Sequence, residues 1–310
     1  MIVDLHSDTI QRAKDENLEL NSKKLSVNTY ELERKLPYIQ CLGTFVNPKY
    51  NIGNGGFERA ISIIDNFYKI YDKDTMYIIK NKREFESKEL EKKIGVMLTI
   101  ENGSAISGKL DNIETLYQKG IRMMGVVWND DNELASGAST NNDKGLTELG
   151  KKYVKKLEDK NIIIDVSHMS KKSFYDTLKA TDTPIIASHS CANSVCNHRR
   201  NLDDDQIKQI AKRNGVIGIC FCKPFLTKEN KATVKDIVNH IDYIVNLVGI
   251  DYISIGSDFD GVDKEHQLED IKGVKEIDKL ILELKLRGYS DDDIEKITSK
   301  NFIRVANKIL

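Results

Sequence analysis

Short, almost uninterrupted apolar segments alternate along the chain with longer segments in which apolar and polar residues mix at helical spacing. Apolar runs without polar alternation are typical of strands that are buried on both faces, as in parallel sheets. Eight such runs therefore predict eight strands, at Ile2–Leu5, Cys41–Val46, Ile94–Ile100, Ile121–Val127, Ile162–Val166, Pro184–Ala187, Gly215–Phe221 and Tyr252–Ile255.

The segments between these runs predict helices. Gly56–Asp72 and Thr147–Asp159 carry apolar residues three and four positions apart, which is the spacing of an amphipathic helix. The other predicted helices are Val234–Val248, Asp270–Arg287, one that begins at Asp203 with acids in its first turn, and a last one capped by Ser290.

Eight strands alternating with helices predict a (β/α)₈ barrel, formed as one domain over residues 1–310. A doubly wound open sheet is the competing architecture. The G-x-G-x-x-G fingerprint of dinucleotide binding is missing from the sequence, which counts against that alternative without excluding it.

Composition narrows the classes of partner. The net charge is −1 and 31% of residues are charged with both signs interspersed, so we expect neither nucleic acid nor a membrane as partner. The first ten residues, MIVDLHSDTI, are unlike a signal peptide, and the five cysteines form no C-x-x-C pair. These features predict a cytoplasmic protein with reduced, buried cysteines, and the base rate for symmetric oligomers makes a homodimer a reasonable expectation.

The candidate chemistry lies directly after the apolar runs. In a (β/α)₈ barrel the active site is built at the C-terminal ends of the strands. His6 and Asp8 follow the first run, Glu101 the third, His168 the fifth and His189 the sixth. Three of the six histidines of the chain therefore fall at strand ends.

These five side chains suit a metal site. His6 and Asp8 are two residues apart, so on a strand they point to the same side. His168 and His189 come from neighbouring strands, which lie about 5 Å apart, and Glu101 has two oxygens with which to bridge two ions. Each residue alone is more often structural, but the set predicts a site for zinc or a neighbouring transition metal.

Further polar residues follow other runs. Trp128 comes after the fourth run and Asp258 after the eighth, whereas Arg199 and Arg200 follow the sixth. An arginine there can hold a substrate carboxylate by a bidentate pair, but the sequence does not decide which of the two faces the site. The three other histidines, His198, His240 and His266, are assigned to packing or to the surface.

Six motifs in this order resemble the membrane (renal) dipeptidase family, the zinc dipeptidases of peptidase family M19, and this resemblance implies an amidohydrolase-like (β/α)₈ barrel. They are DLHSD at 4–8, IEN with Glu101, DVSHMS at 165–170, ASHS at 187–190, RRN at 199–201 and GSDFDG at 256–261. The ending KNFIRV at 300–305 also resembles the last helix of the family, so the similarity spans almost the whole chain.

The resemblance implies a hydrolase that cleaves dipeptides with two Zn²⁺ ions per chain. It implies that a water or hydroxide bridging the ions attacks the peptide carbonyl, that Arg200 receives the substrate's C-terminal carboxylate, and that Asp258 handles protons. The implied ligands are His6 and Asp8 on one ion, His168 and His189 on the other, and Glu101 bridging both.

One departure stands out. The animal members of the family carry a histidine after the fourth strand, where this chain has Trp128. An indole N–H donates one hydrogen bond but cannot become cationic, so oxyanion stabilisation would rest more on the metals. Two alternatives remain: hydrolysis of another amide or cyclic amide, and a metal-binding protein without catalysis. The His-x-Asp opening argues against the first, and the presence of Arg200 and Asp258 argues against the second.

Overall fold

The computed structural model describes all 310 residues of the chain. Eight of its strands are the predicted ones, with bounds that differ by a few residues. They are β1 (Ile2–Ser7), β2 (Tyr38–Thr44), β4 (Ile94–Ile100), β5 (Ile121–Gly125), β6 (Ile163–Asp165), β7 (Ile185–Ser190), β8 (Val216–Ile219) and β9 (Ile253–Ile255).

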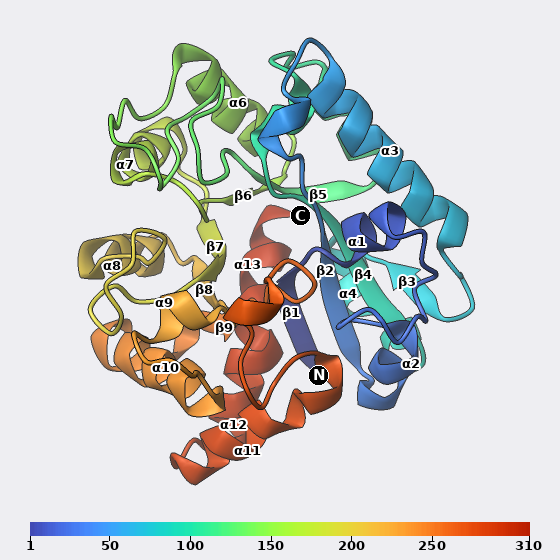
Figure 1. Ribbon diagram of the computed structural model, residues 1–310, viewed down its shortest axis with the longest axis vertical. Helices are drawn as coiled ribbons and strands as arrows, with labels where there is room; N and C mark the ends of the chain where they lie inside the picture. The colour runs from blue at the N-terminus through green and yellow to red at the C-terminus, as the bar shows by residue number, and fades with distance from the viewer.

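These eight strands close into a barrel. Neighbouring strands pair in parallel in the order β2-β1-β9-β8-β7-β6-β5-β4, and β2 pairs again with β4 from Ile39 to Thr44. The helices form a ring around the strands (Figure 1). The predicted (β/α)₈ barrel is therefore confirmed, and the closed strand order excludes the open doubly wound sheet.

A ninth strand, β3 (Met76–Ile78), was not predicted. It pairs only with the first residues of β4, from Ile94 to Val96, whereas β5 pairs with β4 from Leu98 onward. Because β3 has three residues, of which only Met76 is fully buried, it leaves no run that a hydrophobic pattern can detect.

The predicted helices are present with one exception. The helices are α1 (Thr9–Asp15), α2 (Thr29–Leu32), α3 (Gly55–Ile70), α4 (Lys82–Phe85), α5 (Asn112–Gln118), α6 (Glu148–Asp159), α7 (Lys171–Ala180), α8 (Asp204–Lys212), α9 (Lys223–Leu226), α10 (Val234–Val248), α11 (Asp278–Leu286), α12 (Asp291–Glu295) and α13 (Asn301–Ile309). Asp203 caps α8 and Ser290 caps α12, each through a capping box, as their sequence positions indicate.

The helix predicted over Asp270–Arg287 is wrong in its first half. The helix α11 begins only at Asp278, and the preceding residues form a loop with one short turn at Val274–Glu276. Gly273 is fully extended there and packs so closely on the backbone that a β-carbon would lie 2.5 Å from the carbonyl oxygen of Ser26. Tertiary packing of an extended glycine thus overrides the helical spacing.

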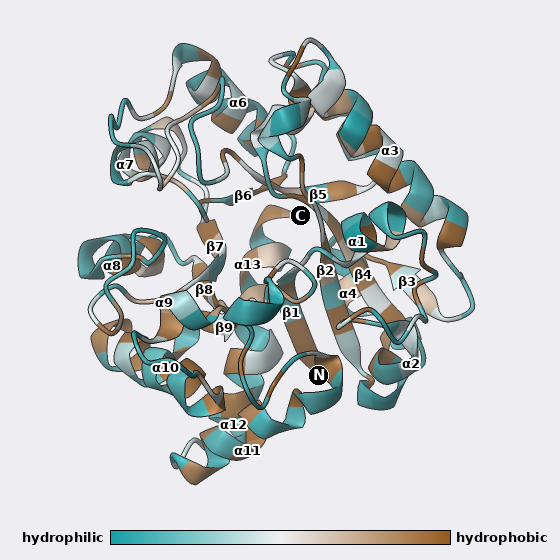
Figure 2. Cartoon of the chain, in the orientation of Figure 1, coloured by the Kyte–Doolittle hydropathy of each residue, from teal (hydrophilic) through white to brown (hydrophobic).

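The apolar side chains form two layers. A large cluster fills the space between the strands and the outer helices. A smaller cluster includes Val3, Leu5 and Met97 from the strands together with Phe302 and Val305 of α13, which closes the barrel at the end opposite the strand ends described below. Figure 2 shows the brown strands surrounded by helices whose outer faces are teal.

Two further expectations can be compared with the structure. All five cysteines are buried and form no disulfide, as their spacing predicts. The longest helices are too short or too polar to cross a bilayer, so the chain has no helical membrane span.

Candidate active site

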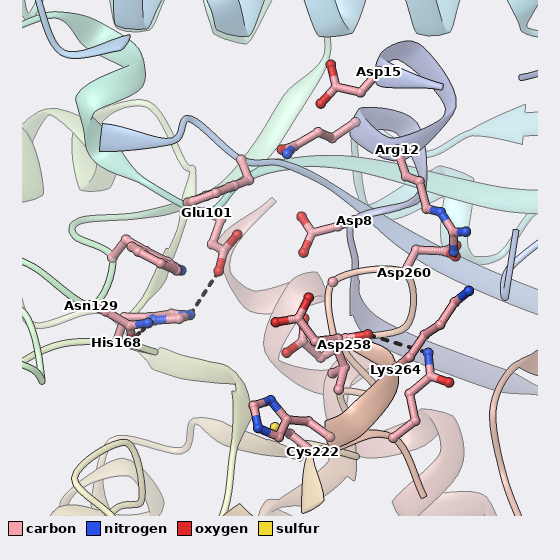
Figure 3. A pocket seen from close by; sticks show the side chains of 18 of the residues that line it. Asp8, Arg12, Asp15, Glu101, Asn129, His168, Cys222, Asp258, Asp260 and Lys264 are labelled. Atoms are coloured by element: carbon pink, nitrogen blue, oxygen red, sulfur yellow. Dashed lines mark hydrogen bonds and ion pairs between the residues drawn. The ribbon is translucent and has the colours of Figure 1, made fainter. Parts of the chain in front are cut away.

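A cavity of about 570 Å³ opens at the C-terminal ends of the barrel strands. Its wall includes Glu101 after β4, Trp128 after β5, His168 after β6 and Asp258 after β9. In Figure 3 the carboxylates of Asp8, Glu101 and Asp258 point into the same space. The residues singled out from the sequence thus come from separate strand ends and meet in one hollow.

The five predicted ligands converge. The Nε2 atom of His6 lies 3.7 Å from Oδ2 of Asp8 and 3.9 Å from Oε2 of Glu101. The other oxygen of Glu101, Oε1, lies 2.9 Å from Nε2 of His168 and 3.7 Å from Nε2 of His189. Glu101 therefore stands between the two pairs, with one oxygen toward each.

His6 and Asp8 meet for a reason that differs from simple strand alternation. The pairing of β1 with β2 shifts register between Asp4 and Ser7, and Asp8 already lies beyond the strand as the residue that precedes α1. The chain turns here, and the turn brings both side chains to the same cavity. The predicted convergence is confirmed, but the strand geometry offered for it is wrong.

Ring nitrogens of His168 and His189 face each other across the site. Nδ1 of His168 lies 2.8 Å from Oδ1 of Asn129, an oxygen that can only accept, so this Nδ1 carries the hydrogen and Nε2 carries a lone pair. Nε2 of His189 lies 2.7 Å away from Nε2 of His168. Burial lowers the pKa of both histidines well below the usual value, which favours neutral rings with one hydrogen each.

Two buried polar atoms of the cluster have no hydrogen-bond partner. They are Nε2 of His6 and Oδ1 of Asp8. Two groups of three possible ligands have donor atoms within 4.8 Å of one another, namely His6 with Glu101 and His189, and His6 with Asp8 and Asp258. Imidazole nitrogens and carboxylate oxygens at this density fit divalent transition-metal ions.

Asp258 is closer to this cluster than its predicted role alone requires. Its Oδ1 lies 3.7 Å from Nε2 of His6, the same distance as Asp8. The backbone of Asp258 is left-handed, with φ of 62°, as is that of His168 with φ of 69°. Such conformations are uncommon for residues other than glycine and concentrate at functional sites.

Burial and mutual repulsion shift the ionisation of the carboxyl groups. Burial raises the pKa of Asp258 to about 7, with His6 and Arg200 opposing the rise and Asp8 adding to it. Burial also raises the pKa of Glu101 well above its usual value. In His6, burial lowers the pKa, but the nearby carboxylates outweigh it and raise the value to about 10. Several acids crowded in one buried site call for compensating positive charge.

The structure separates the two neighbouring arginines. Arg200 is only 5% exposed, its Nη2 donates to the carbonyl oxygen of His189 at 3.4 Å, and its Nε has no partner. Its guanidinium also lies 5.4 Å from the ring centre of Phe225, a residue of the cavity wall. Arg199 is exposed and donates to the carbonyl oxygen of Ser139. Arg200 is therefore the arginine beside the site.

Trp128 forms part of the cavity wall. Its ring centre lies 5.0 Å from that of Phe45 and 6.1 Å from that of His168. The side chain thus borders the histidine pair, at the position where the sequence expectation had put it.

Sequence reasoning missed the residues that orient the histidines. Asn129 contacts His168, and Ser188, which receives support from Asp165, contacts His189. These residues lie next to predicted site residues in the sequence or share a motif with them. The position of a strand end does not show which ring nitrogen of a histidine a neighbouring side chain contacts. His240 is buried between the N–H of Ala192 and the carbonyl of Leu226, which confirms its assignment to packing. Of the two other histidines assigned to packing or to the surface, His198 is half-buried beside Phe225, and His266 lines the rim of the cavity.

Comparison with known proteins decides the family. A family model described as "Membrane dipeptidase (Peptidase family M19)" matches residues 1–309. The chain belongs to this family. It is therefore a metallo-dipeptidase, a hydrolase of peptide bonds. A relative from Klebsiella pneumoniae, described as an uncharacterized protein in the pqqA 5′ region, is 32% identical over 229 residues, covering 71% of this chain and 83% of the relative.

Solved structures share the fold of this dipeptidase family member. A metallo peptidase from Rhodobacter sphaeroides, solved with a phosphinate mimic of the dipeptide L-Ala-D-Ala, superimposes with a TM-score of 0.90 at 20% identity over 100% of this chain and 99% of its own. A probable dipeptidase, PvdM, from Pseudomonas aeruginosa has a TM-score of 0.87 at 22% identity, with 100% and 95% coverage. At these identities the likeness concerns the barrel itself.

Proposed function

We propose that this M19 family member is a dipeptidase that works with two Zn²⁺ ions, held by His6, Asp8, Glu101, His168 and His189. The observation that carries the proposal is the cluster of imidazole nitrogens and carboxylate oxygens in one buried site, where Nε2 of His6 and Oδ1 of Asp8 have no hydrogen-bond partner. Buried polar atoms without a partner are costly, and bound cations would satisfy them. Glu101, with one oxygen toward each pair, would help to hold both ions.

Two zinc ions, when bound by these residues, would supply an acidified water as nucleophile and would polarise the scissile carbonyl. The protein must then orient a dipeptide against that nucleophile. Arg200 is the proposed partner of the substrate's free C-terminal carboxylate, because it is buried, lacks an acidic partner at contact distance, and keeps donor capacity free. Trp128 is proposed as the wall that confines the substrate next to His168.

Asp258 is the proposed proton carrier. Its carboxylate lies 3.7 Å from Nε2 of His6 and borders the cavity, so it is within reach of both the attacking water and the leaving amine. It would accept the proton that the water loses on attacking the carbonyl carbon, and would deliver it to the nitrogen as the C–N bond breaks. The products are two free amino acids, and the carboxylate returns to its starting state.

The test is a hydrolysis screen over dipeptides with metal analysis of the same purified sample. The proposal requires two zinc ions per chain and release of both amino acids. One ion at full loading would contradict the binuclear site. Two ions with no cleavage of any dipeptide would favour the alternatives, which are another amide or cyclic amide as substrate, or metal binding without catalysis.

A further inference from the structure

Two buried aspartates make the same set of hydrogen bonds in two different parts of the barrel. Asp4 on β1 accepts from the backbone N–H of His6 and of Ser257, and from the Ser257 hydroxyl at 2.5 Å. Asp165 on β6 accepts from the backbone N–H of Ser167 and of Ser188, and from the Ser188 hydroxyl, also at 2.5 Å.

The sequences at these two places also correspond. Asp4 and Asp165 each lie within the strand before a metal-site residue, in VDLH at 3–6 and IDVSH at 164–168. The two serines each precede a site residue on the adjoining strand, in IGSD at 255–258 and IASH at 186–189. Each aspartate therefore links two neighbouring strands directly below the side chains that reach the cavity.

The two serine hydroxyls differ in their other contacts. The Ser188 hydroxyl lies 2.8 Å from Nδ1 of His189 and 3.3 Å from the hydroxyl of Ser167. The Ser257 hydroxyl has no histidine side chain beside it; it lies 3.3 Å from the carbonyl oxygen of His6 and accepts from the N–H of Phe259. A carboxylate can only accept, so the single hydrogen of the Ser188 hydroxyl is directed to Asp165. The hydroxyl oxygen is then left to accept a hydrogen from Nδ1 of His189.

We propose that Asp165, acting through Ser188, sets the tautomer of His189. With the hydrogen held on Nδ1, the lone pair of His189 is on Nε2, the atom that faces Glu101 and His168. Asp165 and Ser188 are thus positioning residues for the metal site, and the inference rests on the proposed metal centre. Hydrogen bonding at the far nitrogen is a general means of orienting a ligand histidine.

The hydrogen bonds that run from Asp165 through Ser188 to His189 form a relay. The variant Asp165→Asn keeps these hydrogen bonds but reverses their direction. The amide oxygen must stay toward the N–H groups of Ser167 and Ser188, so the amide nitrogen faces the Ser188 hydroxyl. That hydroxyl then accepts from the amide and donates its own hydrogen to Nδ1 of His189, the acceptor at 2.8 Å. His189 is left with its hydrogen on Nε2, the tautomer that cannot bind a metal through that atom.

The experiment compares Ser188→Ala and Asp165→Asn with the matched controls Ser257→Ala and Asp4→Asn. Each control removes or alters the equivalent bond to a buried partner, so it shares any loss of thermal stability. Competition against a chromogenic chelator should show zinc affinity weakened by about 10–100-fold in the first pair and close to wild type in the controls. Equal weakening in both pairs would reduce the relay to a structural link and overturn the proposal.

A second measurement does not depend on metal. In the metal-free protein labelled with ¹⁵N-histidine, the Nδ1 shift of His189, identified by its absence in a His189→Asn variant, should be that of a protonated nitrogen. Asp165→Asn should move it to the shift of an unprotonated nitrogen, and Asp4→Asn should not. An unprotonated Nδ1 in the wild type would overturn the relay. A wild type that binds no zinc yet shows the protonated Nδ1 would instead refute the proposed metal function and leave the relay standing.

Discussion

Gly261 lies so close to the carboxylates of the site that its lack of a side chain is a requirement. A β-carbon on this residue would lie 2.2 Å from Oδ2 of Asp8 and 2.7 Å from Oδ1 of Asp258. To restore ordinary contact at 3.4 Å, the Asp8 carboxylate must retreat by about 1.2 Å and that of Asp258 by about 0.7 Å. Gly261→Ala therefore displaces two groups of the site together.

A displacement of about 1 Å in a reacting geometry can cost about 10²-fold in rate. We expect Gly261→Ala to lower kcat/KM by about that factor and to weaken zinc binding, with the change seen per folded molecule. The assay is dipeptide hydrolysis at saturating zinc, together with metal content and melting temperature on the same preparation.

Gly273→Ala is the matched control. Its β-carbon would also clash, here with a backbone atom, at 2.5 Å from the carbonyl oxygen of Ser26, and this contact lies in the loop before α11, outside the cavity wall. It should lower the melting temperature and leave metal content and turnover per folded molecule unchanged. If Gly261→Ala behaved in the same way, with full metal content and wild-type kcat/KM, the close approach would have no bearing on the site.

The remaining predictions concern charge and metal. Asp258→Asn should keep the fold and both ions, while kcat falls by about 10²–10⁴-fold, the usual share of general acid–base catalysis. Loss of one ion in this variant would instead make Asp258 a metal ligand, a role that its 3.7 Å distance from Nε2 of His6 also permits. Arg200→Ala should raise KM for dipeptides by the equivalent of about 2–5 kcal/mol and should affect C-terminally amidated substrates much less. Substitution of the exposed Arg199 by alanine should change KM little. Equal losses of Arg200→Ala on both substrate types would refute the contact with the substrate carboxylate. Chelation of the metal should abolish activity and lower the melting temperature. Zinc returned at 100 times its dissociation constant should restore about 2.7 kcal/mol of the free energy of unfolding. A melting temperature that does not change on chelation would contradict a metal bound in the native cluster.

The barrel follows from local features of the sequence. A strand buried on both faces needs consecutive apolar residues, and a helix that covers the sheet needs an apolar stripe. The eight strands and helices such as Val234–Val248 can therefore be predicted from each segment of the sequence separately. The position of Glu101 directly after β4 can also be predicted, because the end of an apolar run marks the end of a strand. Elements without such a pattern escaped detection, as β3 did with its three residues.

What the side chains do beyond the strand ends was decided by the tertiary structure. His168 and Asp258 lie past their strands in left-handed backbone, and Asp8 follows a register shift, so strand alternation does not give their direction. The choice of Arg200 over Arg199 likewise depends on which guanidinium is buried against Phe225. The sequence by itself therefore determined which residues assemble, since their positions along the chain follow from periodicity. Only the tertiary structure decided how their atoms face one another, because loop dihedrals and contacts between distant segments are not encoded in any local pattern.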